Sequence, residues 1–289
     1  LEALSISDSE KVLQNVSKDR VLSSRFAYKD KNFGRRRSEP DCPWRPKARL
    51  VVSGHLDPDV GQVETDAPTV SRTSVLLMLQ IAASRGWQAS VGDVTAAFLN
   101  GERIQRELYV RQPRHGIPGL APGQLLKVHK GIFGLVDSPR GWWLRLLRDL
   151  LGLSIPLDGG RQGKIKQCLL DPCAFVLVDE TTQLPAAYLA THVDDLLVVA
   201  PKELRLRIEK AVSAILPVDE WDTEEFDYIG SHIKQSDEGI FVTQTPFVDG
   251  RLFRLDLLAG QEDGDQATEG QAIDNAHRRA LLAVRAISP

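Results

Sequence analysis

The feature that most constrains this chain is the tetrapeptide His192-Val193-Asp194-Asp195, which stands between two short apolar segments. Residues 186–190 precede it and residues 196–200 follow it, and both segments are short and apolar enough to be buried strands. The pattern predicts a tight β-hairpin with two adjacent carboxylates at its tip, where glycine or asparagine is usual. Because such carboxylates repel each other, a bound divalent cation would stabilise them. An ordinary acidic turn is the alternative.

Hydrophobic patterning predicts the other elements around this hairpin. Strands are expected over residues 47–52, 87–94, 107–110, 125–128, 174–178 and 240–242. An almost wholly apolar helix is expected over residues 73–83 as part of the core, and an amphipathic one over residues 204–215. The polar residues 1–46 are typical of a linker or flexible loop, residues 260–270 of an acidic linker, and residues 275–286 of a tail helix.

One more helix is expected to begin at Ser138-Pro139, with the serine as N-cap and the proline at the first helical position. Its apolar residues recur at helical spacing and predict a buried face. These residues are Trp143, Leu146, Leu147, Leu150 and Leu151.

The order of elements (strand, helix, strands, helix, hairpin, helix) predicts an α+β fold. A split βαβ sheet with its helices on one face fits this order. In that arrangement Asp93 ends one central strand, and Asp194-Asp195 ends the neighbouring strand. The three carboxylates would then converge, which favours a metal site over a plain acidic turn.

Composition limits the function classes less than the charge distribution does. The 289 residues carry a net charge of −3, which by itself argues against a nucleic-acid binder. Residues 1–56 hold 12 Lys/Arg against 7 Asp/Glu, however, whereas residues 215–275 hold 3 against 15. A basic N-terminal lobe could hold a polyanion, although two solvated charged surfaces explain the counts equally well.

Three scattered cysteines favour a reducing compartment, and no apolar run reaches membrane-spanning length. Because Leu1 stands where Met would begin a protein, we expect a piece of something longer.

Several motifs in order resemble the reverse transcriptases of copia-type LTR retrotransposons, from roughly residue 20 to residue 255. The most specific is residues 93–101, Asp-Val-Thr-Ala-Ala-Phe-Leu-Asn-Gly, and the hairpin tetrapeptide occupies the family's Tyr-Val-Asp-Asp position. The other matching segments are residues 47–51, 64–68, 108–113, 131–135, Ser138-Pro139-Arg140 with Trp142, and Tyr228-Ile229-Gly230.

The resemblance implies the fingers and palm of a right-hand polymerase, with a truncated thumb. Residues 1–46 would lead into the fingers, and residues 47–92 would form the fingers and the start of the palm. Residues 93–235 would form the palm, with a fingers segment interleaved at about 105–140. Residues 236–289 would be the truncated thumb or connection with the acidic linker.

The resemblance also implies an RNA-directed DNA polymerase that uses two-metal nucleotidyl transfer. Asp93, the carbonyl of Val94 and Asp194 would hold two Mg²⁺, with Asp195 close by and Mn²⁺ as a substitute. Residues near the incoming deoxynucleoside triphosphate would be Lys47, Arg49, Phe98 as a sugar gate, Phe133 and Gly134. Residues near the RNA or DNA template and its primer would be Ser138, Pro139, Arg140, His192, Tyr228 and Gly230.

The implied partners are this primer–template, the nucleotides and the other Pol domains of the element (integrase and RNase H), with no membrane. The implied location is the cytoplasm, or the nucleus for an integrating element.

Departures from the family pattern keep a second function open. His192 stands where the family has Tyr, Asp66 where it has an aromatic residue, and Asp137 where it has Gln. Without gaps, Glu220 falls where many relatives carry Lys. These changes suit a decayed, non-enzymatic fragment that at most binds RNA or a protein partner. A nucleotide cyclase is a third hypothesis, but it needs a Gly-Gly turn beside the acids that this sequence lacks.

Overall fold

The computed structural model describes residues 1–33, 36, 41–245 and 248. Its four α-helices are α1 (Ile6–Asn15), α2 (Arg72–Arg85), α3 (Ser138–Leu151) and α4 (Lys202–Ser213). The strands of the first half are β1 (Glu2–Ala3), β2 (Val21–Leu22), β3 (Ser24–Asp30), β4 (Pro46–Val52), β5 (Gln88–Val94), β6 (Tyr109–Arg111) and β7 (Leu125–Lys127). Those of the second half are β8 (Ser154–Pro156), β9 (Gln162–Gln167), β10 (Ala174–Asp179), β11 (Pro185–His192), β12 (Asp195–Ala200), β13 (Val218–Asp222), β14 (Glu225–Tyr228), β15 (Ser231–Ser236) and β16 (Gly239–Thr243).

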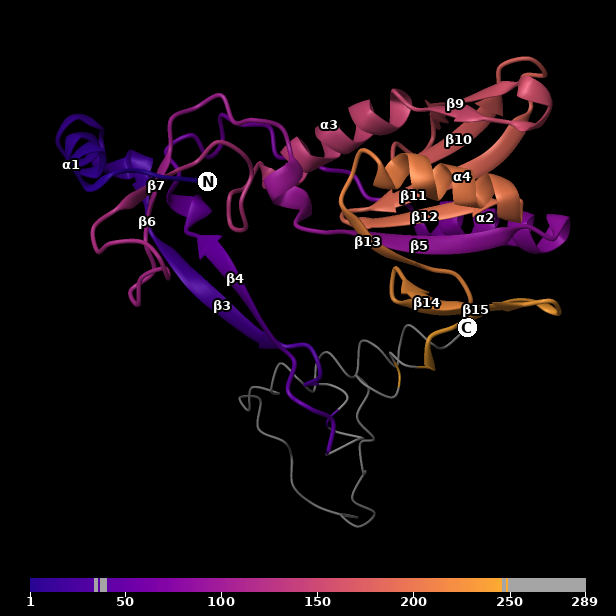
Figure 1. The fold of residues 1–289 in the computed structure, drawn as a ribbon, viewed down its shortest axis with the longest axis horizontal. Helices are drawn as coiled ribbons and strands as arrows, with labels where there is room; N and C mark the ends of the chain where they lie inside the picture. The colour runs from indigo at the N-terminus through magenta and orange to yellow at the C-terminus, as the bar shows by residue number, and fades with distance from the viewer. Residues whose placement is uncertain (34–35, 37–40, 246–247, 249–289) are drawn as a thin grey trace, which may run out of the picture.

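A seven-stranded antiparallel sheet organises the larger half of the molecule, in the order β13-β5-β12-β11-β10-β9-β8 (Figure 1). Its central strands β11 and β12 are nearly continuous apolar runs, so both of their faces must be covered. The predicted hairpin is therefore confirmed as the pair β11–β12 at the centre of this sheet.

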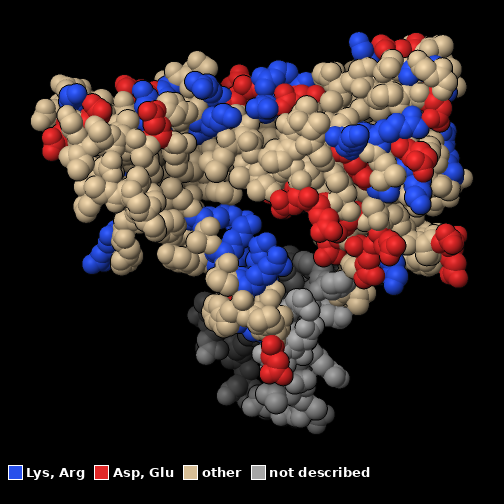
Figure 2. All heavy atoms as spheres, in the orientation of Figure 1, with Lys and Arg blue, Asp and Glu red and all other residues tan. Residues whose placement is uncertain are grey.

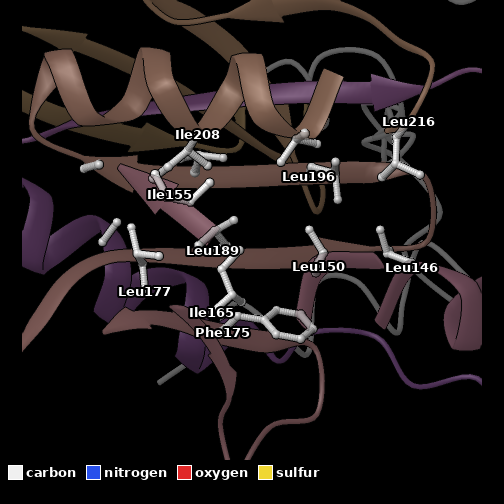
Figure 3. Packing of buried hydrophobic residues seen from close by; sticks show 14 of the residues in the cluster. Leu146, Leu150, Ile155, Ile165, Phe175, Leu177, Leu189, Leu196, Ile208 and Leu216 are labelled. Carbon is white, nitrogen blue, oxygen red and sulfur yellow. The ribbon is translucent and has the colours of Figure 1, made fainter. Parts of the chain in front are cut away.

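Helices cover both faces of this sheet, and the prediction that they share one face is wrong. Leu196 and Val198 of β12 pack with α3 and α4, in the cluster drawn in Figure 3, whereas Leu197 and Val199 pack with α2. Successive residues of β12 point to opposite faces of the sheet, and all of them are apolar after Asp195. Each face of the sheet is therefore covered by its own layer of helices. The α+β class is confirmed. Helix α2 is also only partly core, because Leu76 and Leu77 are exposed.

The N-terminal part forms a second lobe, shown at the left of Figure 1. A four-stranded sheet in the order β1-β7-β6-β2 carries α1 on one side, and β3 and β4 form a long hairpin. Residues 1–33 are therefore not a linker. Ser5 caps α1 by accepting from the Asp8 N–H, and Leu4, Val12 and Val16 pack against the sheet. Because only a few apolar residues form this packing, the hydrophobic pattern of the sequence did not predict α1.

The start of α3 differs from the prediction. The N-cap is Asp137, and the hydroxyl of Ser138 bonds instead to both the N–H and the carbonyl of Ile132. Ser138 therefore holds the loop at Ile132 and does not cap the helix. The buried face also differs from the prediction at both ends, since Trp142 is buried near the start and Leu151 is exposed at the end.

A third sheet, β14-β15-β16, lies beneath β5 in Figure 1. Phe226, Tyr228 and Ile233 of this sheet join the α2 side of the core. The predicted acidic linker, the tail helix and most of the proposed truncated thumb lie outside the described residues.

Candidate active site

Three carboxylates meet at one end of the central strands. Asp93 on β5 and Asp195 on β12 are direct partners in the antiparallel ladder, and Asp194 immediately precedes β12. One oxygen from each of the three lies within 4.8 Å of the others. The convergence expected from the sequence is therefore present, and three hard oxygen donors suit a divalent ion such as Mg²⁺.

The turn that carries Asp194 is tighter than the sequence suggested. His192 pairs with Asp195, so Val193 and Asp194 alone form the two-residue turn, and Asp195 already belongs to β12. Val193 has a φ of 58°, which is the positive value that the first position of a type II′ turn requires. A β-branched residue adopts this conformation only under strain, so the surrounding structure must hold the turn in place.

Two hydrogen bonds hold this turn. The Val94 N–H donates to the carbonyl of Asp194 at 2.8 Å, which ties the turn to β5. The indole N–H of Trp142 on α3 donates to the carbonyl of Val193 at 2.5 Å. Sequence reasoning used Trp142 only as part of a motif, because no local pattern links a helix residue to a distant turn.

Uncompensated negative charge marks the cluster. Burial, followed by the nearby Asp194 and Asp93, raises the pKa of Asp195 to about 6. Burial also raises the pKa of Asp93, with further contributions from Asp194 and Asp219, while Lys47 and Lys31 act in the opposite direction. Carboxylates in this state favour a cation, so the donor set fits a divalent metal ion.

Asp219 is a fourth carboxylate that the sequence reasoning missed. Val218 of β13 pairs with Val94, and Asp219 accepts a hydrogen bond of 2.5 Å from the hydroxyl of Thr95. This edge pairing brings Asp219 close enough to influence Asp93. The sequence prediction considered Glu220 on this strand, one residue after Asp219, and the register of β13 shifts between Val218 and Trp221.

The hairpin β3–β4 presents one strongly basic face. Lys29 lies directly opposite Lys47, and the two-residue period places Arg25 and Arg49 on the same face. Lys31 and Arg45 extend it, and among the described residues none of these six cations forms an ion pair. Figure 2 shows blue atoms along this hairpin facing red atoms across an open space. Like charges directly opposite each other destabilise a hairpin, so this face suits a polyanion.

An aromatic pair lies between β4 and the segment that follows β5. The rings of Phe98 and Phe133 meet edge to face at 5.2 Å, and the guanidinium of Arg49 lies 5.1 Å from the Phe133 ring centre. Phe133 is fixed through its carbonyl, which accepts from the Val52 N–H at 2.8 Å. Gly134 has a φ of 104°, and a side chain there would collide with the Val52 carbonyl. The expected nucleotide-binding residues Arg49, Phe98, Phe133 and Gly134 thus lie together.

The expected template and primer residues lie in different environments. Ser138 and Tyr228 are only 2% exposed, whereas Pro139 and His192 are half-buried. Arg140 forms an ion pair with Glu64 and donates to the carbonyl of Asp66. Gly230 and Ile229 have positive φ values of 68° and 49° and form the β14–β15 turn. Ser138 and Tyr228 are therefore too buried to contact a template or primer directly.

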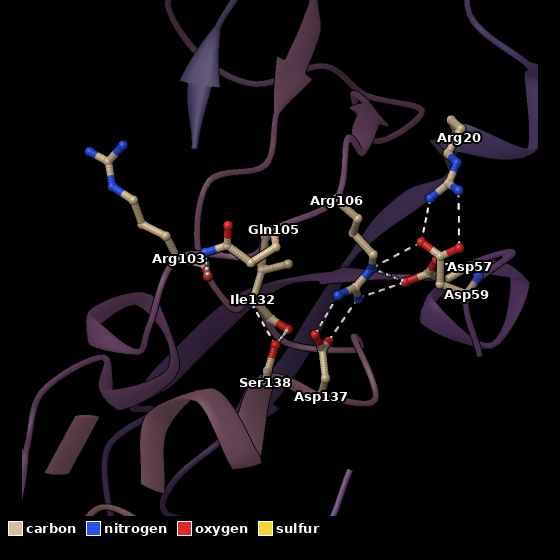
Figure 4. Close-up of polar contacts among 9 residues, drawn as sticks. All are labelled: Arg20, Asp57, Asp59, Arg103, Gln105, Arg106, Ile132, Asp137 and Ser138. Atoms are coloured by element: carbon tan, nitrogen blue, oxygen red, sulfur yellow. Dashed lines mark hydrogen bonds and ion pairs between the residues drawn. The ribbon is translucent and has the colours of Figure 1, made fainter. Parts of the chain in front are cut away.

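Asp137, one of the departures from the family pattern, forms an ion pair with Arg106 of the N-terminal lobe. Arg106 donates to Asp137 through both terminal nitrogens, at 2.5 and 2.9 Å, and also binds Asp57 (Figure 4). Asp59 completes the cluster by pairing with Arg20. These contacts raise the pKa of Arg106 and pair Asp137 with a guanidinium that it shares with Asp57 and Asp59.

Comparisons with known proteins place the chain in a family. Residues 8–258 match the family described as "Reverse transcriptase (RNA-dependent DNA polymerase)". The chain is 29% identical over 217 residues to the retrovirus-related Pol polyprotein from transposon RE2 of Arabidopsis thaliana, covering 74% of this chain and 14% of the relative. It is 30% identical to the Pol polyprotein from transposon RE1 of the same plant, covering 74% and 13%. A third relative, from transposon TNT 1-94 of Nicotiana tabacum, is 30% identical over 50% of this chain and 10% of its own length.

Among solved structures, one match is a telomerase from Candida albicans in complex with a fragment of telomeric RNA. The match covers 81% of this chain and 48% of the telomerase chain. Its TM-score of 0.38 and identity of 9% are too low to support an argument. The family match covers most of the chain, which therefore belongs to the reverse transcriptase (RNA-dependent DNA polymerase) family and resembles that domain of copia-type Pol polyproteins. The chain spans about one seventh of the length of the curated relatives.

Proposed function

We propose that this reverse transcriptase family member is the fingers and palm of an RNA-directed DNA polymerase that extends a primer by two-metal nucleotidyl transfer. The observation that carries the proposal is the convergence of Asp93, Asp194 and Asp195, with oxygens within 4.8 Å of one another. The N-terminal lobe with its basic hairpin would be the fingers, and the seven-stranded sheet would be the palm.

The carboxylates would hold two Mg²⁺, or Mn²⁺ as a substitute, with the Val94 carbonyl as a further ligand. Such ions supply charge neutralisation at the phosphates and activation of the primer 3′-hydroxyl. The protein's part is to keep Asp93 and Asp194 in place, through the β5–β12 ladder and the hydrogen bond from Val94 to Asp194. Asp195, the partner of Asp93, would complete the negative field that attracts the ions.

The incoming deoxynucleoside triphosphate would lie between the carboxylates and the hairpin. Lys47 is near enough to Asp93 to affect its pKa, so the same side chain could bind the phosphates. Arg49 would contribute a second cation, held by Phe133. Phe98, in edge contact with Phe133, would be the wall against a 2′-hydroxyl.

The template and primer would follow the basic face and the catalytic turn. Arg140 and Pro139 on α3 would border the template, with Ser138 supporting the loop at Ile132 from inside. His192 and the Gly230 turn would lie beside the primer end, with Tyr228 packed underneath. We further propose that integrase and RNase H domains of the intact element act with this domain, without a membrane, in the cytoplasm or nucleus. Among the described residues, no helix has the length and apolarity to cross a bilayer.

A non-enzymatic fragment that binds RNA or a protein is the second candidate. Asp219 favours it, because an additional carboxylate beside Asp93 weakens the attraction for an incoming triphosphate. The ion pair between Asp137 and Arg106 speaks against it, since it partly offsets the charge of this departure.

Primer extension on poly(rA)/oligo(dT) with Mg²⁺ or Mn²⁺ separates the two. The polymerase proposal expects dTMP addition by the wild type and a loss of at least about a hundredfold in Asp194→Asn. Extension that is absent from the wild type, while the folded protein still binds the duplex, would favour the fragment. Glu180→Gln, at the far end of the sheet, is the control for a removed carboxylate.

A further inference from the structure

The hydrogen-bond ladder on one side of β5 is incomplete. On its inner side, β5 pairs with β12 from Gln88 to Asp93. On its outer side, β13 pairs with Val94, Gly92 and Val91 and then ends at Asp222. Ala89 lies beyond that end and is 0% exposed, so its outward N–H and carbonyl need partners other than water.

The side chain of Gln235 supplies both partners. Its Oε1 accepts from the Ala89 N–H at 3.0 Å, and its Nε2 donates to the Ala89 carbonyl at 2.7 Å. The same Nε2 also donates to the carbonyl of Thr223, where the chain leaves β13. A primary amide offers a planar acceptor and donor pair, as a peptide group does. Gln235 thus takes the place of the missing strand residue.

These contacts are the polar link between two sheets in the part of the chain that the structure describes. Gln235 belongs to β15, in the three-stranded sheet β14-β15-β16. Within the described residues, its bonds to Ala89 are the hydrogen bonds that connect this sheet to the seven-stranded one. The other links are the two-residue connection from β13 to β14 and apolar packing through Phe226, Tyr228 and Ile233, which is less directional than a hydrogen bond.

The orientation matters because the three-stranded sheet reaches the carboxylates. Its β14–β15 turn follows Tyr228, whose side chain shares a buried cluster with Val91 of β5 and Leu197 of β12. Proximity to Asp195 also contributes, after burial, to the raised pKa of Tyr228. A tilt of the sheet would therefore displace the β14–β15 turn relative to the catalytic end of β5.

We propose that Gln235 is a positioning residue that fixes the β14–β15 turn relative to the three aspartates by completing the ladder on β5. Its consequence for primer alignment rests on the proposed polymerase function. The orientation of the three-stranded sheet by Gln235 does not rest on that function, so the structural role and the polymerase function can fail separately.

Gln235→Met removes the polar atoms at similar length, and Gln235→Glu keeps an acceptor for the Ala89 N–H but loses both donated bonds. Gln167→Met is the matched control, because Gln167, on the far strand β9, donates one hydrogen bond of 2.8 Å to the carbonyl of Pro172. Hydrogen-exchange mass spectrometry of the full chain should show exchange about tenfold faster around Ala89 and across residues 224–243 in Gln235→Met. Gln235→Glu should show a smaller increase around Ala89 than Gln235→Met, and Gln167→Met should show neither change.

Primer extension at saturating nucleotide should then show kcat lower by about tenfold in Gln235→Met, with Gln167→Met unchanged. Unchanged exchange of the three-stranded sheet in Gln235→Met would show that Gln235 does not hold this sheet in place. Faster exchange with unaltered extension overturns the positioning role. If the wild type extends no primer, the proposed function fails, and the exchange result alone decides whether Gln235 orients the sheet.

Discussion

Asp93 and Asp195 face each other directly across β5 and β12, so two carboxylates occupy adjacent positions on one sheet, with Asp194 beside them. Such an arrangement destabilises the folded chain when no cation is bound, because each carboxylate raises the free energy of the others' charged form. Changes at this site are therefore expected to alter the free energy of unfolding as well as the activity.

The pH dependence of stability should report Asp195. Its pKa is about 6 in the folded chain and lower in the unfolded chain, so the folded state binds more protons between these values. The free energy of unfolding in EDTA should therefore decrease as pH rises from about 4 to about 6. Asp195→Asn should flatten this slope and stabilise the metal-free protein at pH 7 by about 1–3 kcal/mol. Urea denaturation at several pH values measures both; an unaltered slope in the variant contradicts the explanation.

Trp142→Phe should loosen the turn that carries Asp194. The variant keeps an aromatic ring in the core but loses the bond to the Val193 carbonyl, at a cost of about 1–3 kcal/mol. Because Val193 is held at positive φ, we expect the Mg²⁺ concentration for half-maximal extension to rise by about tenfold. Trp143→Phe, the neighbouring residue on α3, controls for the loss of an indole. Equal Mg²⁺ requirements in the two variants would assign Trp142 to packing alone.

Phe98 distinguishes a sugar gate from ordinary packing. A hydrophobic pocket discriminates poorly against one added hydroxyl, so rejection of ribonucleotides needs a steric wall. Phe98→Val should raise ribonucleotide incorporation relative to deoxynucleotide while the protein stays folded. If Phe98 only packs against Phe133, the variant should lose about 1–3 kcal/mol of stability without a change in sugar preference. The rNTP/dNTP ratio and the melting temperature, measured together, separate the two roles.

The basic face of β3–β4 should govern the salt dependence of nucleic-acid binding. Replacing Lys29 and Lys47 by Gln removes two unpaired cations, so the slope of log K against log salt should become shallower by about 1.5 to 2. The hairpin itself should gain stability, because two like charges no longer face each other. Lys164 and Lys166 on β9, replaced by Gln in the same way, should leave the slope unchanged. Identical slopes in all three proteins would remove the hairpin from the interface.

The central sheet and the carboxylate convergence could be predicted because strong local patterns encode them. Apolar strands flank His192 and Asp195, and Gly86 ends α2 at a φ of 61°, where glycine is favoured. Helix α1 and strand β3 of the N-terminal lobe could not be predicted, since α1 buries little of its own surface and β3 depends on pairing with β4. The bulged edge strand that brings Asp219 to Asp93 leaves no periodic signal either.

The helix positions show the same limit. Periodicity predicted that α2 and α4 are helices, but it could not tell which face of the sheet each one covers. That choice follows from the alternation of Leu196 and Leu197 toward opposite faces, which becomes informative only once the strand order is known.

The most direct test of the account is the number of Mn²⁺ ions bound per chain, measured by electron paramagnetic resonance with primer–template and a non-hydrolysable deoxynucleotide present. We expect two ions in the wild type, and the loss of at least one in Asp93→Asn and in Asp194→Asn. Asp219→Asn should keep both ions, because its carboxylate bonds to Thr95 and is not one of the three that converge. Binding that is absent from the wild type, or equal in the wild type and Asp93→Asn, would contradict the assignment of this cluster as the catalytic centre.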